Sequence, residues 1–325
     1  MMKDSLSAAL VPRLSPESRN RRAVASGVAV AAVAGDALEG LVFFGSRKSD
    51  AGFNAHSAHD FFLLTRGYRE FYTRLRAAGM LRRPHALVAA LNTLLPPNQL
   101  RLELETTEGP VTAKCAVLTL ESFVQQTSAK SADHFCLGRM FQPAEIVYSA
   151  GPAQNQTLVN AISSAHRLTY RWVRPWLPET FDVDAYYRTL LRVSLSAELR
   201  PESASRAVAL WEAQQPHRRA VYPVLFDELV EIGDLVSLGQ GRFRLAHAVS
   251  RAERWRLQLY FEWSRVRATV RWAKYVVTFD DWLEYILRKI QRHSGQEIQL
   301  TALERRYPLI FLWPRLIRYM RQKEK

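Results

Sequence analysis

Apolar and polar positions along the first half of the chain predict strands that alternate with helices. Two short apolar runs, Leu41–Phe44 and Phe61–Thr65, have the length of buried strands and flank a polar loop. Before them lies Ala23–Gly35, rich in alanine and valine, which starts late and runs directly into Asp36. We expect it to form a helix packed beside the first strand rather than a secretion signal. After them, Tyr68–Met80 carries apolar residues on one helical face.

A β-hairpin is predicted further along, after a helix over Arg83–Pro97 that two prolines end. From 98 to 120, leucines at every second position alternate with charged residues, and Glu108-Gly109-Pro110 turns the chain back. A short helix over Glu121–Gln126 and helical segments that close near Pro178 follow. This alternation predicts one mixed sheet surrounded by helices.

The second half of the chain is mostly helical in pattern. A helix over Pro223–Ile232 precedes two apolar runs that Gly239-Gln240-Gly241 separates. This is the outline of a winged-helix-like module, and a hairpin that caps a helical domain is the alternative. Further helices are predicted over Arg254–Val277 and Asp280–Arg292. The predicted α+β organisation has three parts: a mixed-sheet domain over 1–178, a helical winged-helix-like domain over 179–250, and a helical C-terminal region over 251–325.

Charge is the unusual feature of the composition. The 325 residues carry a formal net charge of +14, which favours polyanionic partners such as nucleotides, nucleic acid or an anionic membrane surface. Residues 251–325 hold 17 Lys and Arg against 8 Asp and Glu, and five of the eight tryptophans. The two cysteines show no metal-ligand spacing and no disulfide framework, which fits a reducing compartment.

Polar residues at the ends of the first two strands suggest a catalytic site. Gly45-Ser46 ends the first strand and Asp60 opens the second. A glycine lets the backbone approach a triphosphate, and a serine hydroxyl can bind phosphate oxygens. A carboxylate on the neighbouring strand can hold Mg²⁺, which offsets the charge that develops during in-line attack at phosphorus. This is the layout of a nucleotidyltransferase site, although Ala58 stands where such sites usually have a first carboxylate; an ordinary strand-loop-strand corner is the alternative.

Several short motifs in order extend this pattern. The chain has Gly45-Ser46, His59-Asp60-Phe61, Lys114 followed by Val117, and Gly138-Arg139-Met140 with Pro143. Over roughly 41–147 it resembles the mitochondrial translocator-maintenance family of phosphatidate cytidylyltransferases, which has a single aspartate on its second strand. The resemblance implies a nucleotidyltransferase-like mixed sheet, then a winged-helix-like domain and a membrane-associating C-terminal helix. It also implies Mg²⁺-dependent transfer of CMP from CTP to phosphatidate, giving CDP-diacylglycerol.

The resemblance assigns roles to particular side chains. Asp60 is expected to hold Mg²⁺ and to be catalytic together with Lys114, which also binds the triphosphate. Gly45, Ser46 and Arg47 are expected to contact phosphates, because Arg47-Lys48 follows where the family continues with a glycine. Arg139 is a candidate phosphate clamp, with an ion pair to Asp133 as the alternative.

A second metal-binding carboxylate is expected on the hairpin, from Glu103 or Glu105, which share a strand face with Arg101. A solvated charged face is the alternative. His56 and His59 lack further ligands at sensible spacing, so a zinc site is not expected.

The terminal segment, Tyr307–Lys325, combines apolar residues, a central tryptophan and arginines. It is too short to span a bilayer but suits an interfacial membrane anchor, and a helix docked on the protein body is the alternative. The lack of a convincing presequence favours the cytoplasmic face of a bacterial inner membrane. Two other functions remain open: a nucleotidyltransferase acting on RNA or a soluble acceptor, and a catalytically inactive membrane-bound member. Nucleic acid is the less expected partner.

Overall fold

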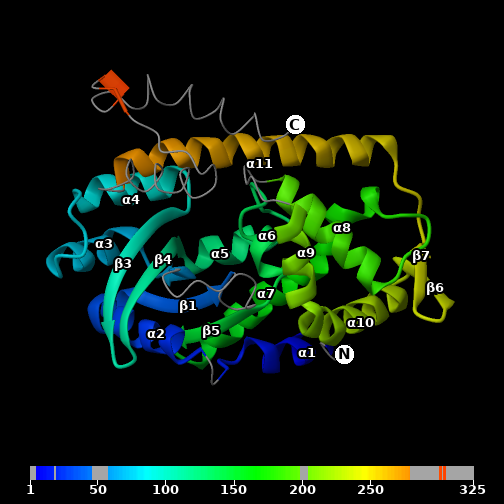
Figure 1. The fold of residues 1–325 in the computed structure, drawn as a ribbon, viewed down its shortest axis with the longest axis horizontal. Helices are drawn as coiled ribbons and strands as arrows, with labels where there is room; N and C mark the ends of the chain where they lie inside the picture. The colour runs from blue at the N-terminus through cyan, green and yellow to red at the C-terminus, as the bar shows by residue number, and fades with distance from the viewer. Residues whose placement is uncertain are drawn as a thin grey trace.

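A mixed five-stranded sheet forms the centre of the molecule (Figure 1). The computed structural model describes residues 5–17, 20–45, 58–197, 204–278, 300–301 and 303–304. The strands are β1 (Leu38–Phe44), β2 (His59–Thr65), β3 (Asn98–Thr106), β4 (Gly109–Thr119) and β5 (Ala144–Ser149). Their order is β3-β4-β2-β1-β5; β2 and β4 run parallel, and the other neighbours are antiparallel. The predicted α+β class, the first two strands and the hairpin are confirmed.

The strand β5 was not predicted from the sequence. It pairs with β1 on the side away from β2 and has the sequence AEIVYS, in which four residues in succession are buried. A strand that is covered on both faces lacks the polar-apolar alternation that marked the hairpin. Because loop residues flank this short run, no strand was predicted for it.

Three helices cover one face of the sheet: α2 (Arg21–Ala34), α3 (Tyr68–Ala77) and α4 (His85–Leu94). Apolar residues from these helices form a core with alternate side chains of the strands, among them Phe43, Phe61 and Leu63. The alanine-rich segment is therefore a helix packed on the sheet, as predicted. A short 3₁₀ helix, η2 (Gly35–Ala37), leads from it into β1.

The other face of the sheet packs against α5 (Leu120–Gln126), α6 (Leu137–Met140) and α7 (Pro152–Val173), which η3 (Arg174–Trp176) follows. This second core continues away from the sheet into α1 (Ser5–Leu14), α8 (Val183–Ser196) and α10 (Gln215–Glu231), with α9 (Ala204–Ala213) between the last two in sequence. It reaches as far as Phe261 in α11. One continuous core thus includes residues from all three predicted parts, whose boundaries stay a prediction.

The helix α1 was not predicted. It packs against α7 and α10, which lie more than 130 residues later in the sequence. The backbone amide of Leu6 donates to Glu228 Oε1 at 2.9 Å, and Arg167 binds the same carboxylate at 3.0 Å. Pro12 lies inside this ten-residue helix, so the sequence signal for a helix was weak.

A two-stranded ribbon follows α10, as expected both for a winged-helix-like module and for a hairpin that caps a helical domain. Its strands are β6 (Leu235–Gly239) and β7 (Arg242–Leu245), paired antiparallel, and Phe243 also pairs with Phe181. The helix before the ribbon begins at Gln215 rather than at Pro223. Pro223 lies within the helix, whereas the sequence-based interpretation placed it at the first turn.

The long helix α11 (Arg251–Thr278) crosses the molecule from the ribbon to α4 (Figure 1). It confirms the helix predicted over Arg254–Val277. The helix predicted over Asp280–Arg292 and the terminal segment 307–325 lie outside the described residues. Among the described helices, none is both long enough and apolar enough to cross a bilayer.

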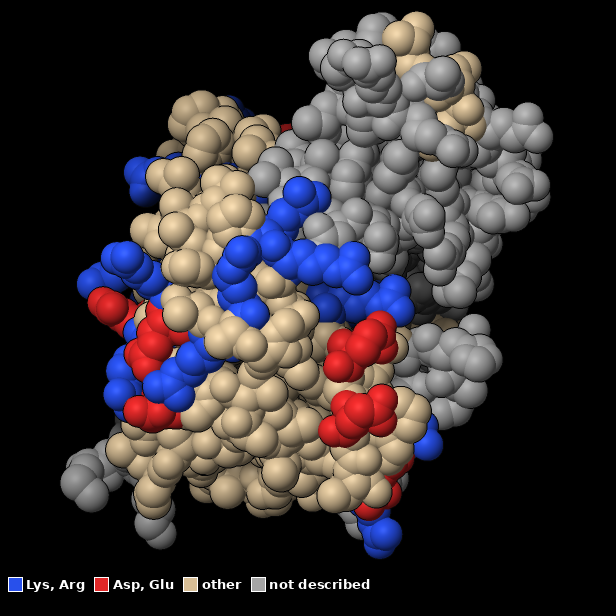
Figure 2. All heavy atoms as spheres, turned by 90° about the vertical axis from the view of Figure 1, so that its left-hand side faces the viewer, with Lys and Arg blue, Asp and Glu red and all other residues tan. Residues whose placement is uncertain are grey.

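Basic side chains are prominent at the end of the molecule that carries α3, α4 and the hairpin. Figure 2 shows Lys and Arg gathered there with acidic side chains among them. Exposed arginines of this region include Arg69, Arg82 and Arg101. The positive charge of the chain is therefore spread over this end as well as over the C-terminal part.

Candidate functional site

The predicted site residue Gly45 lies directly beside Asp60. Phe44, the last residue of β1, is in register with Asp60 on β2. Gly45 has φ of 93°, and a Cβ built on it would lie 2.9 Å from Asp60 Oδ2. A side chain at this position would be strained by its backbone conformation and would collide with the carboxylate. Glycine is therefore required for β1 to end against Asp60.

Asp60 and Lys114 are neighbours on the parallel strands β2 and β4. The two residues are in register, so their side chains leave the same face of the sheet. Each is partly buried. The lysine that stands on an otherwise apolar strand is therefore placed beside a carboxylate, which lowers the free-energy cost of keeping it charged there.

Arg101 extends this row on the next strand. It is in register with Lys114 on the hairpin, so Asp60, Lys114 and Arg101 lie side by side on three adjacent strands. The sequence predicted that Arg101 shares a strand face with Glu103, whereas its position beside Lys114 was not predicted. Counting back from the hairpin turn would have given this pairing, whereas the parallel contact of β2 with β4 has no local sequence signal.

Glu103 is not brought together with Asp60. It is in register with Thr112, so it lies two strands from Asp60 and about 12 Å away between Cα atoms, given the usual strand and residue spacings. Its carboxylate binds Arg101 Nε at 2.8 Å and accepts a hydrogen bond from Thr112 at 2.6 Å. Glu105, opposite Pro110, lies farther towards the turn. The second metal ligand on the hairpin stays a prediction, without a direct contact that supports it.

The opposite face of the same strands is apolar. Cys115, which follows Lys114, is fully buried there. Burial raises the pKa of the Cys115 thiol, and the negative charge of Asp60 raises it further. The thiol therefore stays protonated at neutral pH and is a poor nucleophile.

Arg139 lies in α6, on the face of the sheet that also carries Asp60. Its side chain is largely buried. Nη1 donates to the carbonyl oxygen of Phe135 at 2.7 Å, and the guanidinium lies 3.8 Å from the centre of the Phe135 ring. These contacts hold the arginine against the loop that leads into α6. Its role as a phosphate clamp stays a prediction.

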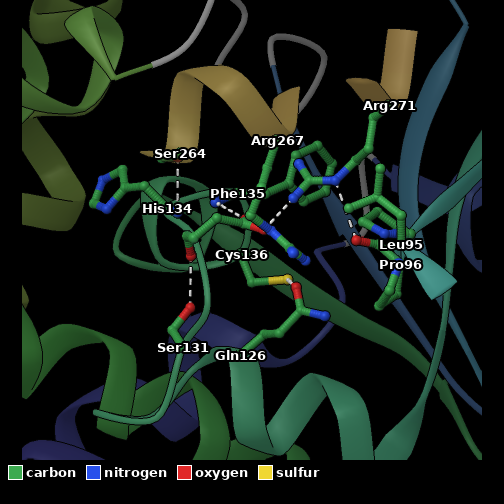
Figure 3. Close-up of polar contacts among 12 residues, drawn as sticks. Leu95, Pro96, Gln126, Ser131, His134, Phe135, Cys136, Ser264, Arg267 and Arg271 are labelled. Carbon is green, nitrogen blue, oxygen red and sulfur yellow. Dashed lines mark hydrogen bonds and ion pairs between the residues drawn. The ribbon is translucent and has the colours of Figure 1, made fainter. Parts of the chain in front are cut away.

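Asp133, the alternative partner considered for Arg139, is bound by two arginines of α11. Figure 3 labels these arginines, Arg267 and Arg271. Arg267 Nε lies 2.7 Å from Asp133 Oδ2, and Arg271 contacts the same oxygen. Burial alone would raise the pKa of Asp133, but Arg271, Arg267 and the amide of Phe135 together hold this pKa below its usual value. The carboxylate is therefore ionised and fixes α11 to the loop before α6.

Lys274 is a second point at which α11 is fixed to the sheet domain. Its ammonium group donates to the backbone carbonyls of Leu95 and Pro97. Arg271, on the same helix, donates to the carbonyl of Pro96 (Figure 3). Burial lowers the pKa of Lys274 to about 7, with further lowering from Arg271 and Arg267. These contacts join residues more than 170 positions apart and are structural in character.

Ser46, Arg47 and His56 lie outside the described residues. The phosphate contacts expected of Ser46 and Arg47, and the expectation that His56 binds no zinc, therefore stay predictions. Within the described ranges, no group of three or more His, Cys, Asp and Glu side chains is arranged to hold a metal ion. Mg²⁺ does not need such a group when it is bound through one or two carboxylates together with substrate phosphates and water. A single partly exposed carboxylate, Asp60, fits that type of binding.

Comparisons with known proteins give no identification. No protein-family model matches the chain, and no curated protein matches it. The likeness to phosphatidate cytidylyltransferases therefore rests on the short motifs of the sequence alone.

Proposed function

We propose that the protein is a nucleotidyltransferase that transfers CMP from CTP to phosphatidate at a membrane surface. The proposal depends above all on one observation. Asp60 and Lys114 stand in register on parallel strands, and Gly45, at the end of β1, is held against the Asp60 carboxylate. A cation, a carboxylate and a glycine close together on one face of a sheet are groups suited to binding a metal-chelated triphosphate.

The proposed reaction forms one bond at phosphorus and breaks another. A phosphate oxygen of phosphatidate attacks the α-phosphorus of CTP, the bond from this phosphorus to the bridging oxygen breaks, and pyrophosphate leaves with the electron pair. Phosphatidate is already ionised at neutral pH, so the attack needs no strong general base. Mg²⁺, when bound, would neutralise phosphate charge and lower the barrier to pyrophosphate departure.

The residues of the site have distinct parts in this scheme. Lys114 would bind triphosphate oxygens by charge-assisted hydrogen bonds. Asp60 would hold Mg²⁺ and would also keep Lys114 in position. Arg101, next in the row, supplies further positive charge towards the hairpin, although Glu103 neutralises part of it.

Incubation of the purified protein with radiolabelled CTP, MgCl₂ and phosphatidate-containing vesicles tests the proposal. We expect label in the organic extract and release of pyrophosphate, both abolished by EDTA. Parallel reactions with RNA in place of lipid test the alternative acceptor. If label enters RNA but not lipid, the acceptor is RNA rather than phosphatidate. If label enters neither, the alternative of a catalytically inactive membrane-bound protein is favoured.

A further inference from the structure

The outward side of α11 carries a row of large apolar side chains that the body of the protein does not cover. We call it the α11 outer face. Each side chain is about half exposed or more: Trp255 61%, Leu259 47%, Trp263 54%, Val266 50% and Val270 52%. Single exposed apolar residues are ordinary on protein surfaces, whereas a contiguous set marks an interaction site. Two of the five side chains are tryptophans, which bury a large apolar area when a partner covers them. Their exposure therefore supports the assignment of this face as an interaction site.

The spacing of these residues makes the row continuous. They follow one another at intervals of four, four, three and four positions, which at 3.6 residues per turn places all five within an arc of about 80°. Phe261, Ser264 and Arg271, which are buried, lie on the opposite side of the helix and face the protein. With a rise of about 1.5 Å per residue the outer face is about 22 Å long. Figure 1 shows α11 along one side of the described part of the molecule.

The surroundings of the outer face are positively charged. Arg251, Arg254 and Arg256 are exposed near the start of the helix. Glu262, the exposed acidic residue beside Trp263, is paired with Arg265 at 2.7 Å. Exposed apolar groups with tryptophan, edged by arginine, are the combination found in helices that lie in the interface of an anionic bilayer.

Charge also decides between the possible occupants. A second copy of the chain would bring another helix with the same surplus of arginine, so its approach would be opposed by repulsion. The terminal segment of this chain, 305–325, has seven Lys and Arg and one acidic residue, and it would be repelled for the same reason. An anionic lipid surface has the complementary charge and accepts tryptophan side chains at headgroup level.

We infer that α11 lies on an anionic lipid bilayer, with its outer face in the interfacial region and its arginines at the lipid phosphates. This adds a lipid-binding surface to the protein within the described residues, separate from the terminal segment predicted from the sequence. It does not depend on catalysis. Because arginine contributes, binding should weaken as the salt concentration rises.

The test is co-sedimentation of the full-length protein with vesicles of phosphatidylcholine and phosphatidylglycerol in equal amounts, compared with vesicles of phosphatidylcholine alone. The variant is Trp255→Ser with Trp263→Ser. The matched control is Val28→Ser with Ile232→Ser, two exposed apolar residues, 63% and 58%, on α2 and just after α10, on the side of the molecule opposite α11 (Figure 1). Thermal unfolding confirms that both variants are folded.

We expect the wild type to bind the anionic vesicles and to bind the neutral ones weakly. The tryptophan variant should need at least about tenfold more lipid for half-maximal binding, given the apolar area it loses, and the control should match the wild type. Equal binding by wild type and tryptophan variant would overturn the inference. A second result would also overturn it: the wild type is a dimer, the tryptophan variant is a monomer, and both bind vesicles equally. That result would assign the α11 outer face to contact with a second copy of the chain.

The proposed function can be judged separately. CMP transfer to a short-chain phosphatidate dispersed in solution should be the same in the tryptophan variant and the wild type. Vesicle binding without any CMP transfer would reject the catalytic proposal and leave the inference about α11 intact.

Discussion

Asp60 and Lys114 lie side by side in register on two parallel strands, although they are 54 positions apart in the sequence. No local pattern makes this contact, which exists because β4 returns next to β2 rather than next to β1. It places a basic group beside Asp60, whose carboxylate lies against Gly45. Substitutions at these three positions therefore test the candidate site most directly.

Asp60→Asn should remove most CMP transfer while the fold survives, because the two side chains have nearly the same volume. A neutral amide binds Mg²⁺ poorly, and loss of several kcal/mol of charge stabilisation corresponds to a rate about 100-fold lower or more. Turnover with labelled CTP measures this. Asp227→Asn, an exposed aspartate on α10, is the control. Near-normal turnover by a folded Asp60→Asn protein would remove Asp60 from the active site.

Lys114→Met should weaken nucleotide binding by roughly 10- to 100-fold, the equivalent of one hydrogen bond to a charged group. Isothermal titration with CTP and Mg²⁺ gives the affinity, and urea unfolding gives the stability. Lys130→Met serves as control, because this lysine is exposed. Unchanged affinity together with a large loss of stability would show that Lys114 is only the structural partner of Asp60.

Gly45→Ala should destabilise the protein by about 1–3 kcal/mol and lower turnover as well. The added Cβ would meet Asp60 Oδ2 at 2.9 Å and would also be strained at φ of 93°. Gly241→Ala separates these effects, because Gly241 has φ of 70° and nothing within 4 Å of the added atom. Urea unfolding of both variants measures the difference. If both variants lose the same unfolding free energy, the contact of the added Cβ with Asp60 does not contribute to the destabilisation.

Asp133→Asn should cost about 3–5 kcal/mol of unfolding free energy, because it leaves Arg267 and Arg271 without their buried carboxylate. Glu262→Gln, which breaks the exposed pair with Arg265, should cost less than about 1 kcal/mol. Chemical denaturation compares the two. Similar small costs would show that α11 is held mainly by apolar packing.

A buried histidine pair predicts sensitivity to acid. His166 Nδ1 donates to the Ile162 carbonyl at 2.9 Å, so Nε2 accepts from His217 Nε2 at 3.2 Å. Burial lowers the pKa of His166 to about 4, from a usual value of 6.5. Between these values the unfolded chain binds a proton that the folded protein does not, so stability should fall as the pH falls from 6.5 to 4, by about 3 kcal/mol in all.

His166→Gln should flatten this dependence, whatever its own cost at neutral pH. The measurement is unfolding free energy against pH for wild type, His166→Gln and His247→Gln, an exposed control. A slope that His166→Gln leaves unchanged would assign the acid sensitivity to other groups.

Local patterns were sufficient for much of the fold. The alternating leucines correctly predicted the hairpin, and the apolar runs on either side of the polar loop correctly predicted β1 and β2. The elements that were missed depend on distant partners. Leu6 and Leu10 of α1 are buried only because α7 and α10 lie beside them, and Pro12 obscured the helical pattern.

The candidate site divides in the same way. Gly45 and Asp60 were predicted from the ends of neighbouring strands, and the structure brings them into contact. The position of Lys114 beside Asp60 required the parallel pairing of β2 with β4, which short motifs do not specify. Glu103 or Glu105 was expected to supply a second metal ligand because both stand on one face of the hairpin strand. Strand alternation gives the face of a residue but not its distance from a given neighbour.

The contact between α1 and α10 bears on how the chain folds during synthesis. Leu6 hydrogen-bonds to Glu228, 222 residues later. At a translation rate of about 5–20 residues per second, the first helix waits roughly ten seconds or more for this partner to leave the ribosome. Until then the leucines of α1 lack the α10 surface that covers them in the folded protein, and an expressed fragment that stops before residue 215 would lack that surface permanently.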